Sequence, residues 1–234
     1  MGGKVKTNHE KGSIAPLPHK RKVRLLLWGG AYKTNDNFTF DWTVRRVVKD
    51  YKASDNNKYE IIVKKIGSAD DLLAVLNGQD DNSIRSLDLF THGGPDHFYM
   101  VSVRSDRDRG LNNFRWYRYV FHNESFSRGD LNKVQFSKFA ENAKVEIHGC
   151  KTASNPKDED NIAADFSKRL YEAGKVKSAV IGHTENATPA INGEEKTKDP
   201  DQDYRNGKRA VFKNGRLVML TEQRGTLDEE KLAQ

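Results

Sequence analysis

One stretch decides the fold of this chain: Ser86-Leu87-Asp88-Leu89-Phe90-Thr91-His92-Gly93-Gly94. It is a short, apolar-rich run that ends at a histidine followed by glycines. A second stretch has the same design, Ala143-Lys144-Val145-Glu146-Ile147-His148-Gly149-Cys150, and it contains the only cysteine of the 234 residues. In an open α/β sheet, reactive side chains collect at the carboxyl ends of the strands. We therefore predict that two neighbouring parallel strands bring an imidazole beside a thiol, the minimum for a cysteine nucleophile with a general base.

Apolar runs alternate with helical patterns along the chain, and this order predicts an α/β fold with a mainly parallel sheet and helices on both faces. Strands are expected near 23–28, 59–64, 86–91, 144–149 and 178–182. Helices are expected over 41–51, 68–76 and 161–173, and Ser68 provides an N-cap for the second. The pair Asn214-Gly215 between two apolar runs predicts a β-hairpin near the C-terminus.

The pattern divides the chain into a basic, flexible N-terminal tail (1–22), one domain (23–221) and a charged C-terminal tail (222–234), frayed or helical. Within the domain, residues 94–130 are rich in aromatic and arginine side chains and form an insertion with a hairpin of its own. Residues 186–207 are polar and are expected to form a loop over the reactive edge. A single cysteine excludes an internal disulfide.

The net charge of +7 is concentrated in the first 24 residues, which hold seven lysines and arginines and one glutamate. Such a tail can contact anionic partners, and a solvated linker is the alternative interpretation. No apolar stretch approaches the roughly 20 residues of a membrane span. The N-terminus lacks the apolar core of a secretory signal. These features predict a cytoplasmic protein, or one exported without a signal peptide.

The order His-Gly after one buried strand and Gly-Cys after the next resembles the caspase-like cysteine peptidases of clan CD, in their bacterial form. The resemblance covers about residues 23–185. Two features depart from the family: the Gln-Ala-Cys-Arg-Gly string of caspases is absent, and His148 stands where related Arg- or Lys-cutting members carry an acidic residue shortly before the cysteine. These departures leave the substrate preference open.

The resemblance implies a cysteine endopeptidase without a cofactor, acting on a protein or peptide as a bacterial effector, toxin or self-processing domain. Cys150 would attack the scissile carbonyl, and His92 would protonate the leaving amine and later activate water. The backbone N–H groups of Gly93 and Cys150 would bind the oxyanion. A helix N-terminus after Thr152 is expected to favour the thiolate.

The family's geometry also implies a pocket for the P1 side chain. It would be lined by Tyr32, Lys33, His148, His183, Thr184 and Glu185. His148 has an equal alternative, in which it points into the opposite face of the sheet. Lys33, His148 and His183 would favour an acidic P1 residue, whereas Glu185 and Asp36 would favour a basic one, which is the preferred expectation. His97, His122 and His183 match no usual zinc spacing with Cys150, so no metal is expected.

Two other classes of function compete with the peptidase. One is a catalytically silent caspase-like domain that binds a protein partner. The other is a nucleic-acid-binding protein that uses the aromatic and arginine residues of 94–130. Nucleic acid is the less favoured partner because the positive charge is confined to the tail.

Overall fold

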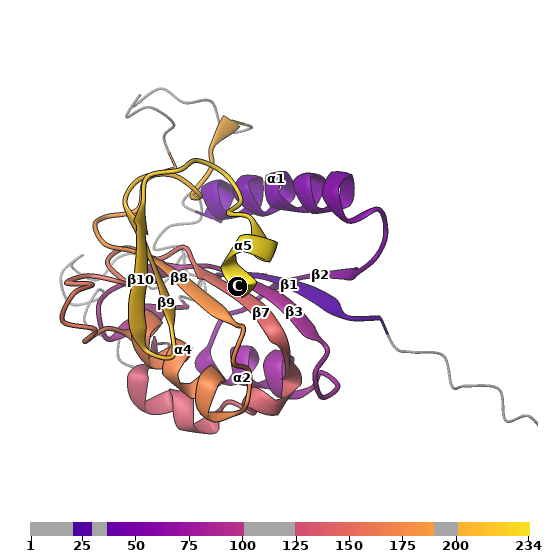
Figure 1. Ribbon diagram of the computed structural model, residues 1–234. Coiled ribbons are helices and arrows are strands. Elements are labelled where there is room, and N and C mark those ends of the chain that lie inside the picture. Colours follow the sequence, from indigo (N-terminus) through magenta and orange to yellow (C-terminus); the bar gives the residue numbers. More distant parts are fainter. Residues whose placement is uncertain (1–20, 30–36, 101–124, 190–200) are drawn as a thin grey trace, which may run out of the picture.

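The fold is built around one large sheet, shown in Figure 1. The computed structural model describes residues 21–29, 37–100, 125–189 and 201–234. Within these ranges seven strands form the sheet, in the order β10-β9-β8-β7-β3-β1-β2. Their bounds are β1 (Val23–Trp28), β2 (Glu60–Lys65), β3 (Ile84–Phe90), β7 (Phe139–Ile147), β8 (Ala179–His183), β9 (Arg209–Lys213) and β10 (Arg216–Thr221). Five adjacent strands, β2, β1, β3, β7 and β8, run parallel. Strand β9 is antiparallel to both β8 and β10. The predicted mainly parallel sheet is confirmed.

Helices cover both faces of the sheet, as predicted (Figure 1). Alternate residues of a strand point to opposite faces, so each strand contributes to two cores. Leu25 packs in the core that contains Leu72, whereas Leu26 packs with Val44 in the other. The helices concerned are α1 (Asn37–Asp55) on one face and α2 (Ala69–Asn77) and α4 (Ile162–Glu172) on the other.

The predicted helix and turn signals act as expected. The side-chain oxygens of Ser68 and Asn161 each accept the backbone N–H three residues ahead, at 3.1 and 3.0 Å, and so begin α2 and α4. Asn214 and Gly215 have φ angles of 50° and 73° and connect the hairpin strands β9 and β10. Left-handed residues at both positions match the right-handed twist of such a hairpin.

The predicted insertion contributes a second, smaller sheet beside the end of β3. Its described strands are β4 (His92–Gly93), β5 (His97–Tyr99) and β6 (Ser125–Ser127), all antiparallel to their neighbours. Stacked rings of Phe98 and Phe126, with centroids 4.9 Å apart, form its buried side. Residues 101–124, which carry most of the aromatic and arginine side chains of the insertion, lie outside the described residues. The chain then continues through the short helices η2 (Arg128–Lys133) and η3 (Phe136–Lys138).

The C-terminal segment is docked rather than frayed. Leu227 is buried, and the short helix α5 (Glu229–Ala233) follows it. Glu229 pairs with Arg24 at 2.6 Å and with Arg85 at 2.7 Å, so the helix is fixed to the beginnings of β1 and β3. Most of the predicted N-terminal tail, residues 1–20, lies outside the described residues.

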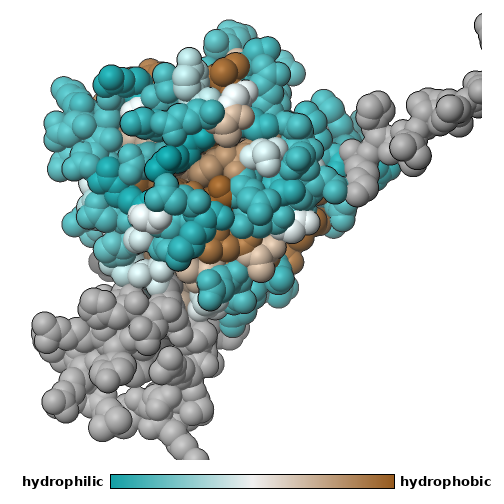
Figure 2. Space-filling view, turned by 90° about the horizontal axis from the view of Figure 1, so that it is seen from below, coloured by the Kyte–Doolittle hydropathy of each residue, from teal (hydrophilic) through white to brown (hydrophobic). Residues whose placement is uncertain are grey.

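The surface on the side of α2 and α4 is largely hydrophilic, with hydrophobic residues visible near its middle (Figure 2). None of the described helices has the length and apolar character needed to cross a membrane.

Candidate active site

The two strand ends predicted to carry the reactive residues lie side by side. β3 and β7 are adjacent and parallel, with Leu89 opposite Ile147 at their carboxyl ends. The backbone N–H of His148 still donates to the Leu89 carbonyl at 2.8 Å, one residue beyond β7. His92 follows β3 and Cys150 follows β7, so both residues emerge at the same edge of the sheet.

Glycines allow the two loops to touch. A Cβ added to Gly93 would lie 3.0 Å from the Cα of Gly149 and 3.0 Å from the carbonyl oxygen of Cys150. A Cβ added to Gly149 would lie 3.1 Å from the Cα of Gly93. Because real Cβ atoms are rarely found this close, the glycine after His92 and the glycine before Cys150 are both needed for this approach.

The loop that carries Cys150 is attached to the chain after β8. Cys150 is half-buried, and its Sγ lies 3.7 Å from the carbonyl oxygen of Ala187. The N–H of Lys151 donates to the carbonyl of Glu185 at 2.9 Å. The hydroxyl of Thr152 donates to the Ile147 carbonyl at 3.2 Å and so connects the turn to the end of β7. The predicted loop 186–207 therefore begins beside the thiol.

The helix expected after Thr152 does not follow it at once. Residues 151–153 form turns, and α4 begins only at Ile162, after its cap Asn161. The field of a helix terminus acts within about one turn. The N-terminus of α4 nevertheless lies against this loop, because the N–H of Ala163 donates to the Thr152 carbonyl at 3.2 Å.

Aromatic rings hold His92 in place. His92 is half-buried, and its ring meets the ring of Phe40 edge-on, with centroids 5.4 Å apart. Phe40, from α1, stacks in turn on Tyr204, with centroids 5.5 Å apart. No local pattern indicates this arrangement, because Phe40 lies before the start of the predicted helix and Tyr204 lies in a segment predicted to be a polar loop.

The structure separates the predicted P1-pocket residues into three groups. Tyr32 and Lys33 lie outside the described residues. His148 and His183 are fully buried, with side chains inside the fold rather than on a surface pocket, so the structure contradicts their assignment as substrate-binding residues. The reason is that both side chains point to the sheet face that α1 covers. Thr184 is half-buried and Glu185 is exposed.

Thr184 and Glu185 border a cavity of about 460 Å³. Its other walls come from the loop after Cys150, from the end of β8 and from the C-terminal hairpin, and they include Asn155, Pro156, Lys208, Leu220 and Glu222. The Glu185 carboxylate pairs with Lys208 at 2.8 Å, and both side chains are exposed. The cavity thus offers an apolar wall and a partly neutralised acidic rim.

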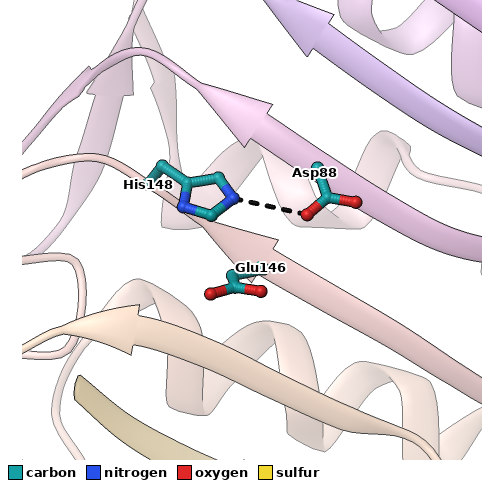
Figure 3. A group of neighbouring side chains, drawn as sticks. All are labelled: Asp88, Glu146 and His148. Carbon is teal, nitrogen blue, oxygen red and sulfur yellow. Dashed lines mark hydrogen bonds and ion pairs between the residues drawn. The ribbon is translucent and has the colours of Figure 1, made fainter. Parts of the chain in front are cut away.

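Beneath the edge, the α1-facing side of the sheet is lined with buried ionic groups. Figure 3 shows three of them, Asp88 on β3 and Glu146 and His148 on or just after β7. His148 Nε2 lies 3.3 Å from an Asp88 oxygen, and the other Asp88 oxygen accepts the Tyr51 hydroxyl at 2.7 Å. Desolvation raises the pKa of Asp88, but Lys144 and His148 outweigh this and hold the pKa below its usual range.

These three residues are also the group that could hold a metal, since one ligand atom from each lies within 4.8 Å of the others. The carboxylates already have partners. Glu146 pairs with Arg209 and, at 3.5 Å, with Lys144. A divalent cation would add unbalanced positive charge to a buried site where Lys144 and Arg209 already stand opposite the two carboxylates. The arrangement therefore favours a buried ion-pair network over a metal centre.

His183 is the second histidine on this side of the sheet. Its ring centroid lies 6.4 Å from that of His148, and its Nε2 has no hydrogen-bond partner among the described residues. Desolvation, together with the charges of His148 and Arg209, lowers the pKa of His183 to about 3. The imidazole is therefore neutral at physiological pH and does not provide a positive charge for a substrate.

Comparison with known proteins found no family model, no curated protein and no solved structure that matches this chain.

Proposed function

We propose that the protein is a cysteine endopeptidase in which Cys150 is the nucleophile and His92 the general acid and base. The contact between the backbones of Gly93 and Gly149 is the observation that carries this proposal, because it brings the two reactive loops together at the edge of the sheet. Ligand-binding and reactive groups commonly lie at this edge of the sheet in α/β proteins. A thiol paired there with an imidazole can act as a nucleophile with a general base.

The reaction would proceed in two halves. In the first, the Cys150 thiolate attacks the carbonyl carbon of the peptide bond, and the C–N bond breaks as His92 gives a proton to the leaving amine. A thioester then joins the acyl part of the substrate to Sγ. In the second half, His92 takes a proton from water, the hydroxide attacks the thioester, and the C–S bond breaks to release the carboxylic acid and the thiolate.

Backbone groups would stabilise the negative charge that develops on the carbonyl oxygen in both halves. We assign this role to the N–H groups of Gly93 and Cys150, which belong to the two touching loops. The absence of a side chain at Gly93 gives a carbonyl oxygen room to approach.

Substrate side chains would enter the cavity bordered by Thr184 and Glu185. The main chain of Glu185 is hydrogen-bonded to the residue after Cys150, so the cavity is joined to the nucleophile through one loop. An apolar wall from Leu220 together with the Glu185 carboxylate suits a long side chain with a basic end, such as lysine or arginine.

The test is peptide hydrolysis by the full chain with a fluorogenic library that varies the P1 residue. We expect cleavage by the wild type, none by Cys150→Ala, and a loss of roughly 100-fold or more in His92→Ala. His97→Gln is the control, because His97 lies in the same small sheet and bonds to Tyr99 rather than facing the thiol. Cleavage that survives in Cys150→Ala would contradict the proposal. Absence of cleavage together with an unreactive thiol in the folded wild type would favour the silent, partner-binding domain.

A further inference from the structure

We infer that His148 is the positioning residue of the proposed catalytic pair: its buried ring joins the end of β7 to the end of β3 and so fixes Cys150 relative to His92. This inference rests on the proposed function. It replaces the expectation that His148 contacts substrate, which its complete burial contradicts.

The place of His148 in the chain suits this role. It stands two residues before Cys150, and Phe90 stands two residues before His92. The rings of His148 and Phe90 lie flat on each other, with centroids 4.2 Å apart and planes at 6°. The backbone N–H of His148 also donates to Leu89. Phe90, the last residue of β3, is thus in contact with His148, the first residue after β7.

A hydrogen bond controls the rotation of the His148 ring. Nε2 lies 3.3 Å from Asp88, and Asp88 is itself held by the Tyr51 hydroxyl from α1. All three side chains are buried. A phenylalanine could provide the stacking on Phe90, whereas only a side chain with a polar group at the position of Nε2 can also bond to Asp88.

Other charged groups face the ring from neighbouring elements. Glu146 and Lys144 lie on β7, two and four residues before His148, and His183 lies at the end of β8. These groups form pairs of their own, Glu146 with Arg209 and with Lys144. The bond to Asp88 is the one hydrogen bond of the His148 ring among the described residues, since its Nδ1 has no partner there. Removing that bond therefore releases the ring without breaking a second one.

The experiment measures two properties of the full chain: the pH dependence of Cys150 alkylation by iodoacetamide, and kcat and KM for the best peptide of the library. His148→Phe keeps the stacking and loses the hydrogen bond. His148→Gln places an amide nitrogen near Nε2 and keeps the bond. We expect the alkylation midpoint of His148→Phe to rise toward that of His92→Ala, and kcat to fall about tenfold or more with KM nearly unchanged. His148→Gln should recover part of both.

The control is Val145→Ala. Val145 lies on β7 and is buried on the opposite face of the sheet, in the core shared with α2 and α4, so the substitution creates a cavity there. It should reduce thermal stability and leave the alkylation midpoint at the wild-type value. If Val145→Ala moves the midpoint as far as His148→Phe does, general loosening explains the effect and the inference is wrong. If His148→Phe does not fold, Asp88→Asn removes the charged acceptor and is expected to give the same shift.

The outcomes separate this inference from the function on which it rests. If the wild-type thiol reacts with the pH dependence of free glutathione, His92 does not activate Cys150. The proposed function and this inference are then both wrong. A wild-type thiol that is activated, with an unchanged profile in both His148→Phe and Asp88→Asn, overturns the positioning role alone.

Discussion

Gly93 and Gly149 lie in backbone contact at the junction of the two reactive loops. The Thr152 methyl group lies 2.8 Å from the position of a Cβ on Gly93, and the Cα of Gly93 lies 3.1 Å from that of a Cβ on Gly149. Neither glycine has a positive φ angle, so the requirement is one of space and not of backbone conformation.

Gly149→Ala should therefore destabilise the protein through overpacking, by about 1–3 kcal/mol in the free energy of unfolding. Urea denaturation measures this. Gly129→Ala is the matched control, because the nearest atom to its added Cβ would be the Ser127 hydroxyl at an ordinary 3.6 Å. Equal stability of the two variants would show that the loops are further apart than described.

Cys150 should be alkylated by iodoacetamide near neutral pH faster than glutathione, because the proposed pairing with His92 would favour the reactive thiolate. His92→Ala should slow the reaction, and Phe40→Leu should slow it less, since Phe40 only supports the His92 ring. Mass spectrometry of samples quenched over time gives the rates. A thiol that reacts only after unfolding would identify Cys150 as a core residue.

Glu185 should favour a basic P1 residue, and Lys208 should weaken that preference by pairing with it. We expect Glu185→Gln to lower kcat/KM for arginine and lysine substrates and Lys208→Met to raise it, because a charge mismatch at a substrate pocket opposes binding. Cleavage after aspartate alone, or an unchanged preference in Glu185→Gln, would refute the assignment and leave the cysteine mechanism intact.

Glu229 should anchor the C-terminal helix. Glu229→Gln removes the carboxylate that Arg24 and Arg85 share and leaves Arg85 without this ion pair. We expect a loss of roughly 3 kcal/mol, near the lower end for a buried pair because Glu229 is not completely covered. Glu230→Gln, in the next position and exposed, should change stability little. Thermal and urea unfolding of both variants would test the difference.

His183 should make the protein less stable in acid. Its pKa of about 3 in the folded state lies below the roughly 6.5 of an unfolded chain, so the unfolded state alone takes up a proton as the pH falls below about 6.5. This favours unfolding by about 2 kcal/mol at pH 5. Between pH 7.5 and pH 5, the free energy of unfolding should decrease in both proteins. The decrease should be about 2 kcal/mol smaller in His183→Gln than in the wild type. Equal falls would show that His183 is protonated in the fold.

Local signals were sufficient to predict the elements of this fold. Ser68, Asn161 and Asn214-Gly215 act within a few residues of themselves, so caps and turns could be identified without tertiary information. The same holds for the order of strands and helices, which restricts the sheet to a few topologies. Boundaries were predicted less well. Helix α1 spans Asn37–Asp55 and extends beyond both predicted ends, and β7 begins at Phe139, before its predicted start, where Phe139 and Ala140 are buried.

Apolar runs and glycines are sufficient to predict that a histidine and the single cysteine follow strands of one parallel sheet. The groups beneath them depend on packing between distant segments. Asp88, Glu146 and His148 alternate with apolar residues, a pattern that equally describes a strand face exposed to water. Here α1 and α5 lie over that face and β9 adjoins it: Tyr51 of α1 bonds to Asp88, Arg209 of β9 pairs with Glu146, and Glu229 of α5 lies 4.0 Å from Lys144. A charged side chain is buried at low cost only when it has charged or hydrogen-bonding partners. Here these partners come from distant parts of the chain, so a local sequence pattern cannot predict them.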